Sequence, residues 1–396
     1  MNPGKILGIF KKGAKATSKK KGKKGDEKTY AWPSGIKVGI YGHSNSGKTV
    51  YYTVLNEECK ISKDLQISVM DGSTASEFLT NYRSLWGLGM ASEAGTMVDF
   101  RGEKKFPDPT AGDKVLQFNA ILDHSHKLSI VAYDYNGKAV SISEKHELDE
   151  KVHDFMASSD GLLFFFDPKV MGAELQTQAC VAAFVNMLER LAPLSSRLPV
   201  PIALVITKAD ILPGFTENQA VLVNPAEEHI ISEDFELFLE KVLSSNKIAS
   251  NPAWAGSVRN ILVKLREFLR IVVGRTLNFQ IFFLSNTGDP PEKIGTEVGR
   301  SIYTPPAKIR PIGVKEPFYW LLNAIIRNRR LKRFRKLAKY VTVISILWML
   351  LYSLPFLYHF KIALPKPVKL ENRILKTHDG SHLSTSENER RTIMSA

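Results

Sequence analysis

Cysteine is scarce in this sequence, with only Cys59 and Cys180 among 396 residues. The two lie far apart and no ligand-like spacing surrounds them, so the sequence indicates neither a disulfide framework nor a zinc site. We expect two buried small side chains and a reducing compartment. Charged residues make up only 24% of the chain against 44% apolar residues, which excludes a wholly disordered protein. The length suits one large domain or two modest ones.

Acidic residues are too few to balance the basic ones, and the formal net charge is +14. Residues 1–30 hold ten lysines and two acids, while residues 327–339 hold eight basic residues and no acid. Each segment therefore carries +8, and the body between them is mildly acidic because the whole chain carries only +14. Both clusters lack the interleaved aromatics on which bases stack. We therefore expect no nucleic-acid partner.

Long apolar runs are also rare, and residues 341–360 form the one that lacks Asp, Glu, Lys and Arg over twenty positions. A helix of this length covers a hydrocarbon layer of about 30 Å, and the basic block before it suits anionic headgroups. The sequence thus predicts a single-pass transmembrane helix whose N-terminal side, with its excess of basic residues, faces the cytoplasm. A buried helix of the globular domain and a re-entrant hairpin at Pro355 remain alternatives. Residues 361–396 are predicted to be a disordered polar tail.

The N-terminal leader, residues 1–34, combines a short apolar stripe from Ile6 to Phe10 with a Lys/Gly run. Such a segment can lie on an anionic membrane, and a solvated disordered leader is an equal alternative. No apolar core of signal-peptide length follows the first lysines, and Asn2 excludes N-myristoylation.

Residues 36–49 carry the strongest chemical signal. A β-rich run, IKVGIY, leads into GHSNSGKT and then into a plausible helix, which meets the G-x-x-x-x-G-K-[ST] pattern in the strand-then-helix setting that it requires. Backbone N–H groups of such a loop converge on phosphate oxygens at a helix N-terminus. The lysine neutralises the β and γ phosphates and the threonine hydroxyl ligates Mg²⁺. The predicted nucleotide-binding loop comprises Gly42, His43, Ser44, Asn45, Ser46, Gly47, Lys48 and Thr49.

Three later apolar runs end in polar residues that suit the same site. LSIVAYD ends at Asp134, a candidate Mg²⁺ ligand, and continues to Gly137, whose backbone can approach the γ phosphate. Asn136-Gly137 could instead be a type I′ turn. PIALVITKAD ends in a run that contains Thr207, Lys208 and Asp210. The Asp210 carboxylate can accept both N1–H and N2–H of guanine. NFQIFFLSN brings a last candidate loop for the base, formed by Ser285, Asn286 and Thr287.

With these elements in this order, the chain resembles the translation-factor and Ras-like (TRAFAC) class of P-loop GTPases. GHSNSGKT matches the phosphate loop, DYNG the switch II motif, TKAD the guanine-specificity motif and LSNTG, loosely, the last base-contacting loop. The likeness covers about residues 35–325 and is nearest to the prokaryotic double-GTPase-like branch. It implies a doubly wound, mostly parallel α/β sheet, with GTP or GDP and Mg²⁺ as ligands.

The resemblance also implies a switch I threonine that senses Mg²⁺ and the γ phosphate. We assign Thr110, with Thr96 as the alternative, so that Lys48, Thr110 and Gly137 are the predicted catalytic residues and Thr49, Thr110 and Asp134 the predicted metal ligands. An inserted helix around residues 74–87 and a long effector-type loop are expected before Thr110. Lys138 follows DYNG where many small GTPases have a water-positioning glutamine. Intrinsic hydrolysis is therefore expected to be slow, or to use Arg101, His43 or a partner's arginine.

The sequence thus predicts a membrane-anchored GTPase of five segments: a leader (1–34), a GTPase domain (35–326), a basic juxtamembrane segment (327–340), the apolar span (341–360) and a tail (361–396). The expected partners are an anionic membrane, a protein effector and an activating protein. A GTP-binding scaffold without hydrolysis is the main alternative. An ATPase coupled to transport is a further alternative, which the guanine-specific Asp210 disfavours.

Overall fold

The computed structural model describes residues 30–43, 45–88, 104–107, 113–135, 150–169, 174–192, 198, 200–215, 222–223, 235–276, 278–297 and 300–363. The chain divides into two compact units, Met1–Lys332 and Arg333–Ala396. The strands are β1 (Ile36–Gly42), β2 (Leu65–Val69), β3 (Lys114–Leu122), β4 (His126–Asp134), β5 (Gly161–Phe166), β6 (Ile202–Ile206), β7 (Leu222–Val223), β8 (Phe279–Phe283), β9 (Glu292–Glu297) and β10 (Arg300–Thr304). The helices are α2 (Lys48–Lys60), α3 (Gly72–Trp86), α4 (Glu150–Ala157), α5 (Glu174–Leu191), the 3₁₀ turn η3 (Ala209–Ile211), α6 (Phe235–Leu243), α7 (Asn246–Ala249), α8 (Pro252–Lys264), α9 (Arg266–Arg275) and α10 (Lys315–Ala363).

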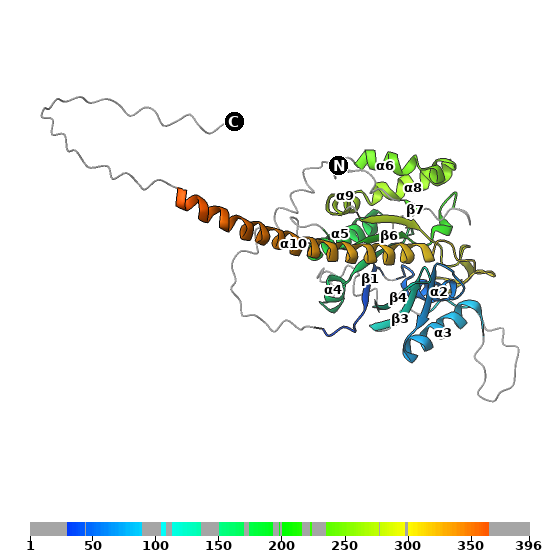
Figure 1. Ribbon diagram of the computed structural model, residues 1–396. Helices are drawn as coiled ribbons and strands as arrows, with labels where there is room; N and C mark the ends of the chain where they lie inside the picture. The colour runs from blue at the N-terminus through cyan, green and yellow to red at the C-terminus, as the bar shows by residue number, and fades with distance from the viewer. Residues whose placement is uncertain are drawn as a thin grey trace, which may run out of the picture. The chain divides into compact units, whose positions relative to one another are not determined.

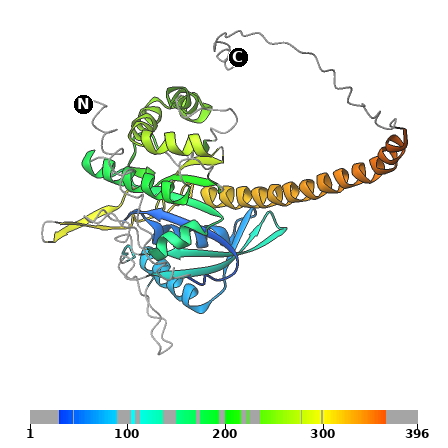
Figure 2. The ribbon, with the colours of Figure 1, turned by 90° about the vertical axis from the view of Figure 1, so that its left-hand side faces the viewer.

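An eight-stranded sheet in the order β2-β3-β4-β1-β5-β6-β8-β7 forms the centre of the first unit. Strands β4, β1, β5, β6 and β8 run parallel to one another, whereas β2, β3 and β7 pair antiparallel with their neighbours. Helices cover both faces of the sheet, as Figures 1 and 2 show. This is the doubly wound, mostly parallel α/β architecture that the sequence predicts.

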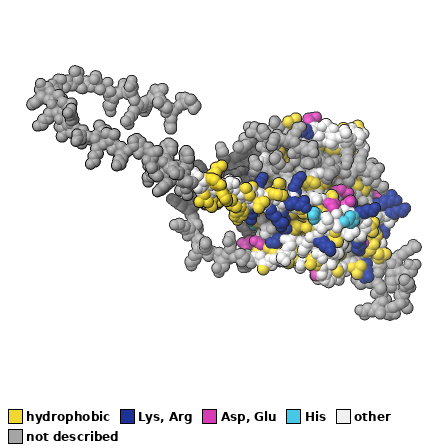
Figure 3. Space-filling model, viewed as in Figure 1, with side chains coloured by type: hydrophobic (Ala, Val, Ile, Leu, Met, Phe, Trp, Pro, Cys, Tyr) yellow, Lys and Arg dark blue, Asp and Glu magenta, His cyan; other side chains and the backbone are white. Residues whose placement is uncertain are grey.

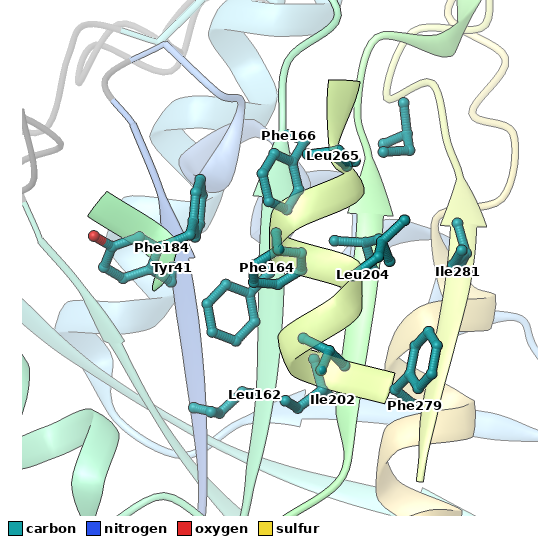
Figure 4. Packing of buried hydrophobic residues seen from close by; sticks show 14 of the residues in the cluster. Tyr41, Leu162, Phe164, Phe166, Phe184, Ile202, Leu204, Leu265, Phe279 and Ile281 are labelled. Atoms are coloured by element: carbon teal, nitrogen blue, oxygen red, sulfur yellow. The ribbon is translucent and has the colours of Figure 1, made fainter. Parts of the chain in front are cut away.

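The apolar sequence of β5, GLLFFF, explains why the sheet is covered on both sides. Successive side chains of a strand point to opposite faces, and all six residues of β5 are buried. Phe164 packs on one face with Phe184 of α5 and Phe268 of α9, as Figure 4 shows for Phe164 and Phe184. Phe165 packs on the other face against Tyr51 of α2. Strands of this kind are typical of parallel sheets buried between two helical layers.

Strands β3 and β4 form a hairpin that ends at Asp134. Its register runs from Lys114 opposite Asp134 to Leu122 opposite His126. The turn places Asp123 and His124 at φ 48° and 56°, a left-handed conformation that Asp, Asn and His adopt more readily than other side chains. Because β4 pairs directly with β1, Asp134 at the end of the hairpin lies near the end of β1.

Other predicted elements were found with altered limits. The inserted helix expected at 74–87 is α3. The amphipathic sequence of residues 257–277 is typical of one helix, but the segment does not form a single helix. It divides into α8 and α9 at Leu265, which has φ −87° and ψ 4° and a fully buried side chain. The strands β2 and β7 and the separate β9–β10 hairpin, visible in Figure 2, had no counterpart in the sequence analysis.

Helix α10 begins at Lys315 and continues without a break to Ala363. Its first turns pack on the sheet through the buried Phe318, Leu321 and Leu322. Three arginines of the basic block, which belong to the first unit, contact other elements of that unit: Arg329 donates to Asp160 at 2.8 Å, Arg330 lies 3.0 Å from the ring nitrogen of His126, and Arg327 donates to Asn278 at 3.3 Å.

The predicted membrane-spanning helix at 341–360 lies within α10. Among the residues that the structure describes, no helix combines the length and the apolarity needed to cross a membrane.

Candidate functional site

The phosphate loop lies where β1 ends at Gly42 and α2 begins at Lys48. Asn45 and Gly47 adopt positive φ angles of 63° and 88°, which turn the backbone back toward the helix N-terminus. Gly42 is packed so tightly that a Cβ atom there would lie 2.9 Å from Cβ of Phe165. The predicted loop thus has the tight turn that phosphate binding requires; Ser44 lies outside the described residues.

Lys48 is buried beneath this loop. Its Nζ donates to the carbonyl oxygens of Gly42 at 2.9 Å and His43 at 3.2 Å. The pKa of Lys48 is lowered to about 8, because the effect of burial exceeds the opposing effect of the nearby Asp134 carboxylate. Two backbone carbonyl oxygens of the loop therefore hold the ammonium group of Lys48 at the loop.

Thr49 and Asp134 meet beside the loop. The Thr49 hydroxyl donates to a carboxylate oxygen of Asp134 at 3.0 Å, and the Asp134 side chain is almost wholly buried. The structure thus brings two of the three predicted metal ligands together. A hydroxyl and a carboxylate oxygen at a phosphate loop are the donor set that Mg²⁺ prefers, so the residues fit this ion.

His43 packs its ring edge-on against Phe184 of α5 at 5.6 Å between centroids. Burial and then the neighbouring Lys48 charge lower the pKa of His43 to about 4. The imidazole is therefore neutral at physiological pH, which removes it as a cationic substitute for a catalytic arginine.

The predicted base-binding residues follow the neighbouring strands. Asp210 lies in η3 after β6, and the Ser285 hydroxyl after β8 donates to it. Burial raises the pKa of the Asp210 carboxyl, against which the hydrogen bond from Ser285 acts. The two loops are joined by a backbone bond from Ala209 N–H to Leu284 O at 2.9 Å. Asp210 is thus held at the carboxyl edge of the sheet, beside the phosphate loop.

The remaining predicted base-binding residues form hydrogen bonds with the backbone of neighbouring segments. Thr207 is fully buried and donates to the carbonyl of Phe166 at 3.2 Å. Asn286 donates to the Gly47 carbonyl at 3.5 Å, which links the base loop to the phosphate loop. Thr287 accepts a backbone hydrogen bond from Arg310 at 2.9 Å, which fixes the loop from its other side.

Two residues near the site were missed by the sequence analysis. Asp167 directly follows β5 and forms an ion pair with Lys208, and its signal was an acid after a buried strand, as for Asp134. Tyr135 follows β4; its hydroxyl accepts the Gly42 N–H at 3.2 Å. No pattern in the sequence marks a tyrosine at this position as part of a phosphate site.

Several predicted residues lie outside the described part of the chain. These are the switch I candidates Thr110 and Thr96, and Gly137, Lys138 and Arg101. Beside Thr49, a cleft of about 840 Å³ opens between α3 and the start of β3, lined mainly by hydroxyl and amide side chains of α3.

No known family profile and no curated protein matches this sequence. Among solved structures, the chain is similar to the small GTPase Arl6 (BBS3) of Trypanosoma brucei with a bound nucleotide analogue, at 15% identity over 74% of this chain and 98% of that one, with a TM-score of 0.30. It is also similar to an ADP-ribosylation-factor-like protein, the small COPII coat GTPase SAR1 of Encephalitozoon cuniculi with GDP, at 12% identity over 76% and 85% of the two chains and a TM-score of 0.30. A third is the signal recognition particle receptor complex SRb-GTP/SRX of Chaetomium thermophilum, at 12% identity over 68% and 100% and a TM-score of 0.30. At these values the likenesses carry no argument about function, which rests on the residues above.

Proposed function

We propose that this protein is a GTP-binding molecular switch that holds GTP with Mg²⁺ and hydrolyses it slowly to GDP. The observation that carries the proposal is the convergence of three elements at one edge of the sheet: the phosphate loop with buried Lys48, the Thr49–Asp134 oxygen pair, and Asp210 held by Ser285. Ligands of doubly wound sheets bind at this carboxyl edge.

Each element has a defined task in this proposal. The N–H groups at the start of α2 and the Lys48 ammonium bind the phosphates, and the Asp210 carboxylate accepts the N1–H and N2–H of guanine. Thr49 and Asp134 would hold Mg²⁺, which neutralises phosphate charge when bound. Adenine lacks the donor pair that Asp210 reads, so GTP is favoured over ATP.

Equilibrium titration with GTP and ATP in the presence of Mg²⁺ tests the binding part of the proposal. Wild-type protein is expected to prefer GTP, and both Lys48→Ala and Asp210→Ala are expected to lose that binding. Equal affinity for the two nucleotides, or unchanged binding in both variants, contradicts it.

Single-turnover phosphate release separates the switch from a scaffold that binds GTP without hydrolysis. Lys138 after DYNG, in place of a water-positioning glutamine, is the feature that makes the scaffold the second candidate. Slow release of phosphate supports the switch, and retention of intact GTP over hours supports the scaffold.

We also propose that the protein attaches to an anionic membrane through α10. After Arg327, Arg329 and Arg330, the exposed basic side chains Lys332, Arg333, Arg335, Lys336 and Lys339 precede exposed apolar ones from Val341 to Tyr352. Figure 3 shows basic and apolar side chains along α10. Anionic headgroups would attract the first group and acyl chains would accept the second. The predicted single-pass topology with a cytoplasmic GTPase domain belongs to this proposal, and protease protection of the reconstituted protein tests it.

Liposome flotation of the full chain tests the attachment. The triple variant Lys332→Glu, Arg335→Glu, Lys336→Glu is expected to lose binding to anionic vesicles. The control Lys63→Glu, Lys127→Glu, Lys293→Glu changes the net charge equally at exposed sites of the first unit and is expected to float like the wild type. Equal loss in both variants would indicate attraction to the whole protein's charge and contradict a role for α10.

A further inference from the structure

Tyr135 contacts the phosphate loop at two points. Its side chain is fully buried, its hydroxyl accepts the Gly42 N–H at 3.2 Å, and its ring face lies 5.0 Å from Nζ of Lys48. The first glycine and the lysine of the loop therefore share one neighbour, which comes from a different strand.

The sheet explains why a side chain takes this place. The described register between β1 and β4 ends at the pair Val38 and Ala132, whereas β1 continues to Gly42. Gly42 is buried, and an unpaired N–H at such a position costs free energy comparable to a lost hydrogen bond. The Tyr135 hydroxyl supplies an acceptor for this N–H.

We propose that Tyr135 is a positioning residue of the phosphate site: its hydroxyl fixes the start of the phosphate loop, and its ring holds the Lys48 ammonium toward the β and γ phosphates. This inference rests on the proposed binding of guanine nucleotides. Lys48 donates to the carbonyls of Gly42 and His43, and on binding it would exchange these for phosphate oxygens. A cation–π contact has no fixed donor direction, so the ring supports the ammonium before and after this exchange.

Two variants separate the two contacts. Tyr135→Phe keeps the ring and deletes the hydroxyl, and it is expected to raise the Kd for GTP, GDP and GMP by roughly 5- to 30-fold because the loop loses its anchor. Tyr135→Leu also deletes the ring. It is expected to raise the Kd for GTP and GDP by a further factor of about 2 to 5, with no further effect on GMP, which lacks the phosphates that the lysine contacts.

Tyr51→Phe is the matched control. Tyr51 is also fully buried, on α2, and its hydroxyl has no hydrogen-bond partner among the residues that the structure describes. Removing this hydroxyl is expected to leave all three affinities unchanged, and circular dichroism melting establishes that each variant is folded.

Competition against a fluorescent GDP gives the three dissociation constants for each protein. Wild-type GTP affinity in Tyr135→Phe would overturn the role of the hydroxyl. A Tyr135→Leu variant that weakens GMP as much as GTP would overturn the role of the ring and indicate simple loss of packing. If the wild-type protein itself binds no guanine nucleotide, the proposed function fails, and that result is distinct from both.

Discussion

Asp210→Asn is the substitution that tests recognition of guanine most selectively. The exchange preserves the shape of a side chain that is held by the Ser285 hydroxyl, so the loop after β6 should keep its conformation. It removes the charge, and it turns one of the two acceptor positions toward guanine into an N–H donor. That donor would face the N2–H of guanine, and two donors repel.

The magnitude follows from the hydrogen bonds that are lost. A hydrogen bond to a charged group contributes about 1.5–3 kcal/mol, and the bond that the amide oxygen retains becomes weaker because it loses its charge. Losing one such bond and weakening the other should reduce the affinity for GTP by roughly 10- to 10³-fold. Xanthine carries a carbonyl where guanine carries the 2-amino group, and that carbonyl can accept from the new Asn amide. The variant should therefore prefer XTP to GTP.

Competition titrations with GTP, XTP and ATP against a labelled nucleotide measure this reversal. Asp210→Glu is a useful companion because it retains the charge and changes the reach of the carboxylate. A variant that still prefers GTP to XTP, at close to wild-type affinity, would show that Asp210 does not contact the base.

Three further outcomes follow from the structure. Thr49→Val removes the hydroxyl that lies 3.0 Å from Asp134. The affinity of this variant for GTP in Mg²⁺ should fall to the affinity that the wild-type protein shows in EDTA, and its affinity in EDTA should equal that of the wild type. A variant whose affinity for GTP still depends on Mg²⁺ refutes Thr49 as a ligand of the ion. Phe164→Ala empties a fully buried position and should lower the free energy of unfolding by about 3–5 kcal/mol, whereas Ile61→Ala, at a side chain that is 89% exposed, should change it little in the same urea titration. Burial lowers the pKa of His43 from 6.5 to about 4, so between these pH values His43 is protonated in the unfolded chain and neutral in the folded one. The free energy of unfolding should therefore fall as the pH drops from 6.5 to about 4. A His43→Gln variant whose stability depends equally steeply on pH would exclude His43 as the cause.

The sheet and the phosphate site were predictable because each rests on a local signal. Buried parallel strands such as β5 read as continuous apolar runs, and the loop from Gly42 to Thr49 has a spacing that serves one kind of ligand. The order of these signals along the chain then placed Asp134 and Asp210 at the same edge of the sheet.

The features that the sequence did not predict depend on contacts between distant segments. The Asp167–Lys208 ion pair, for example, joins residues 41 positions apart. Tyr135 is another such case, because its importance depends on how far the β1–β4 ladder extends. Likewise, nothing in the sequence of the basic block of α10 indicates that Arg327, Arg329 and Arg330 contact Asn278, Asp160 and His126.

The central claim is that the edge of the sheet formed by the phosphate loop and Asp210 binds a guanine nucleotide. Calorimetric titration of the wild-type protein with GTP and then with ATP, both with Mg²⁺, measures this directly. We expect one GTP per chain and an affinity for ATP that is lower by roughly 100-fold or more, because ATP cannot supply the two N–H donors that the Asp210 carboxylate accepts. Equal affinities, or no heat of binding with GTP, would contradict the account.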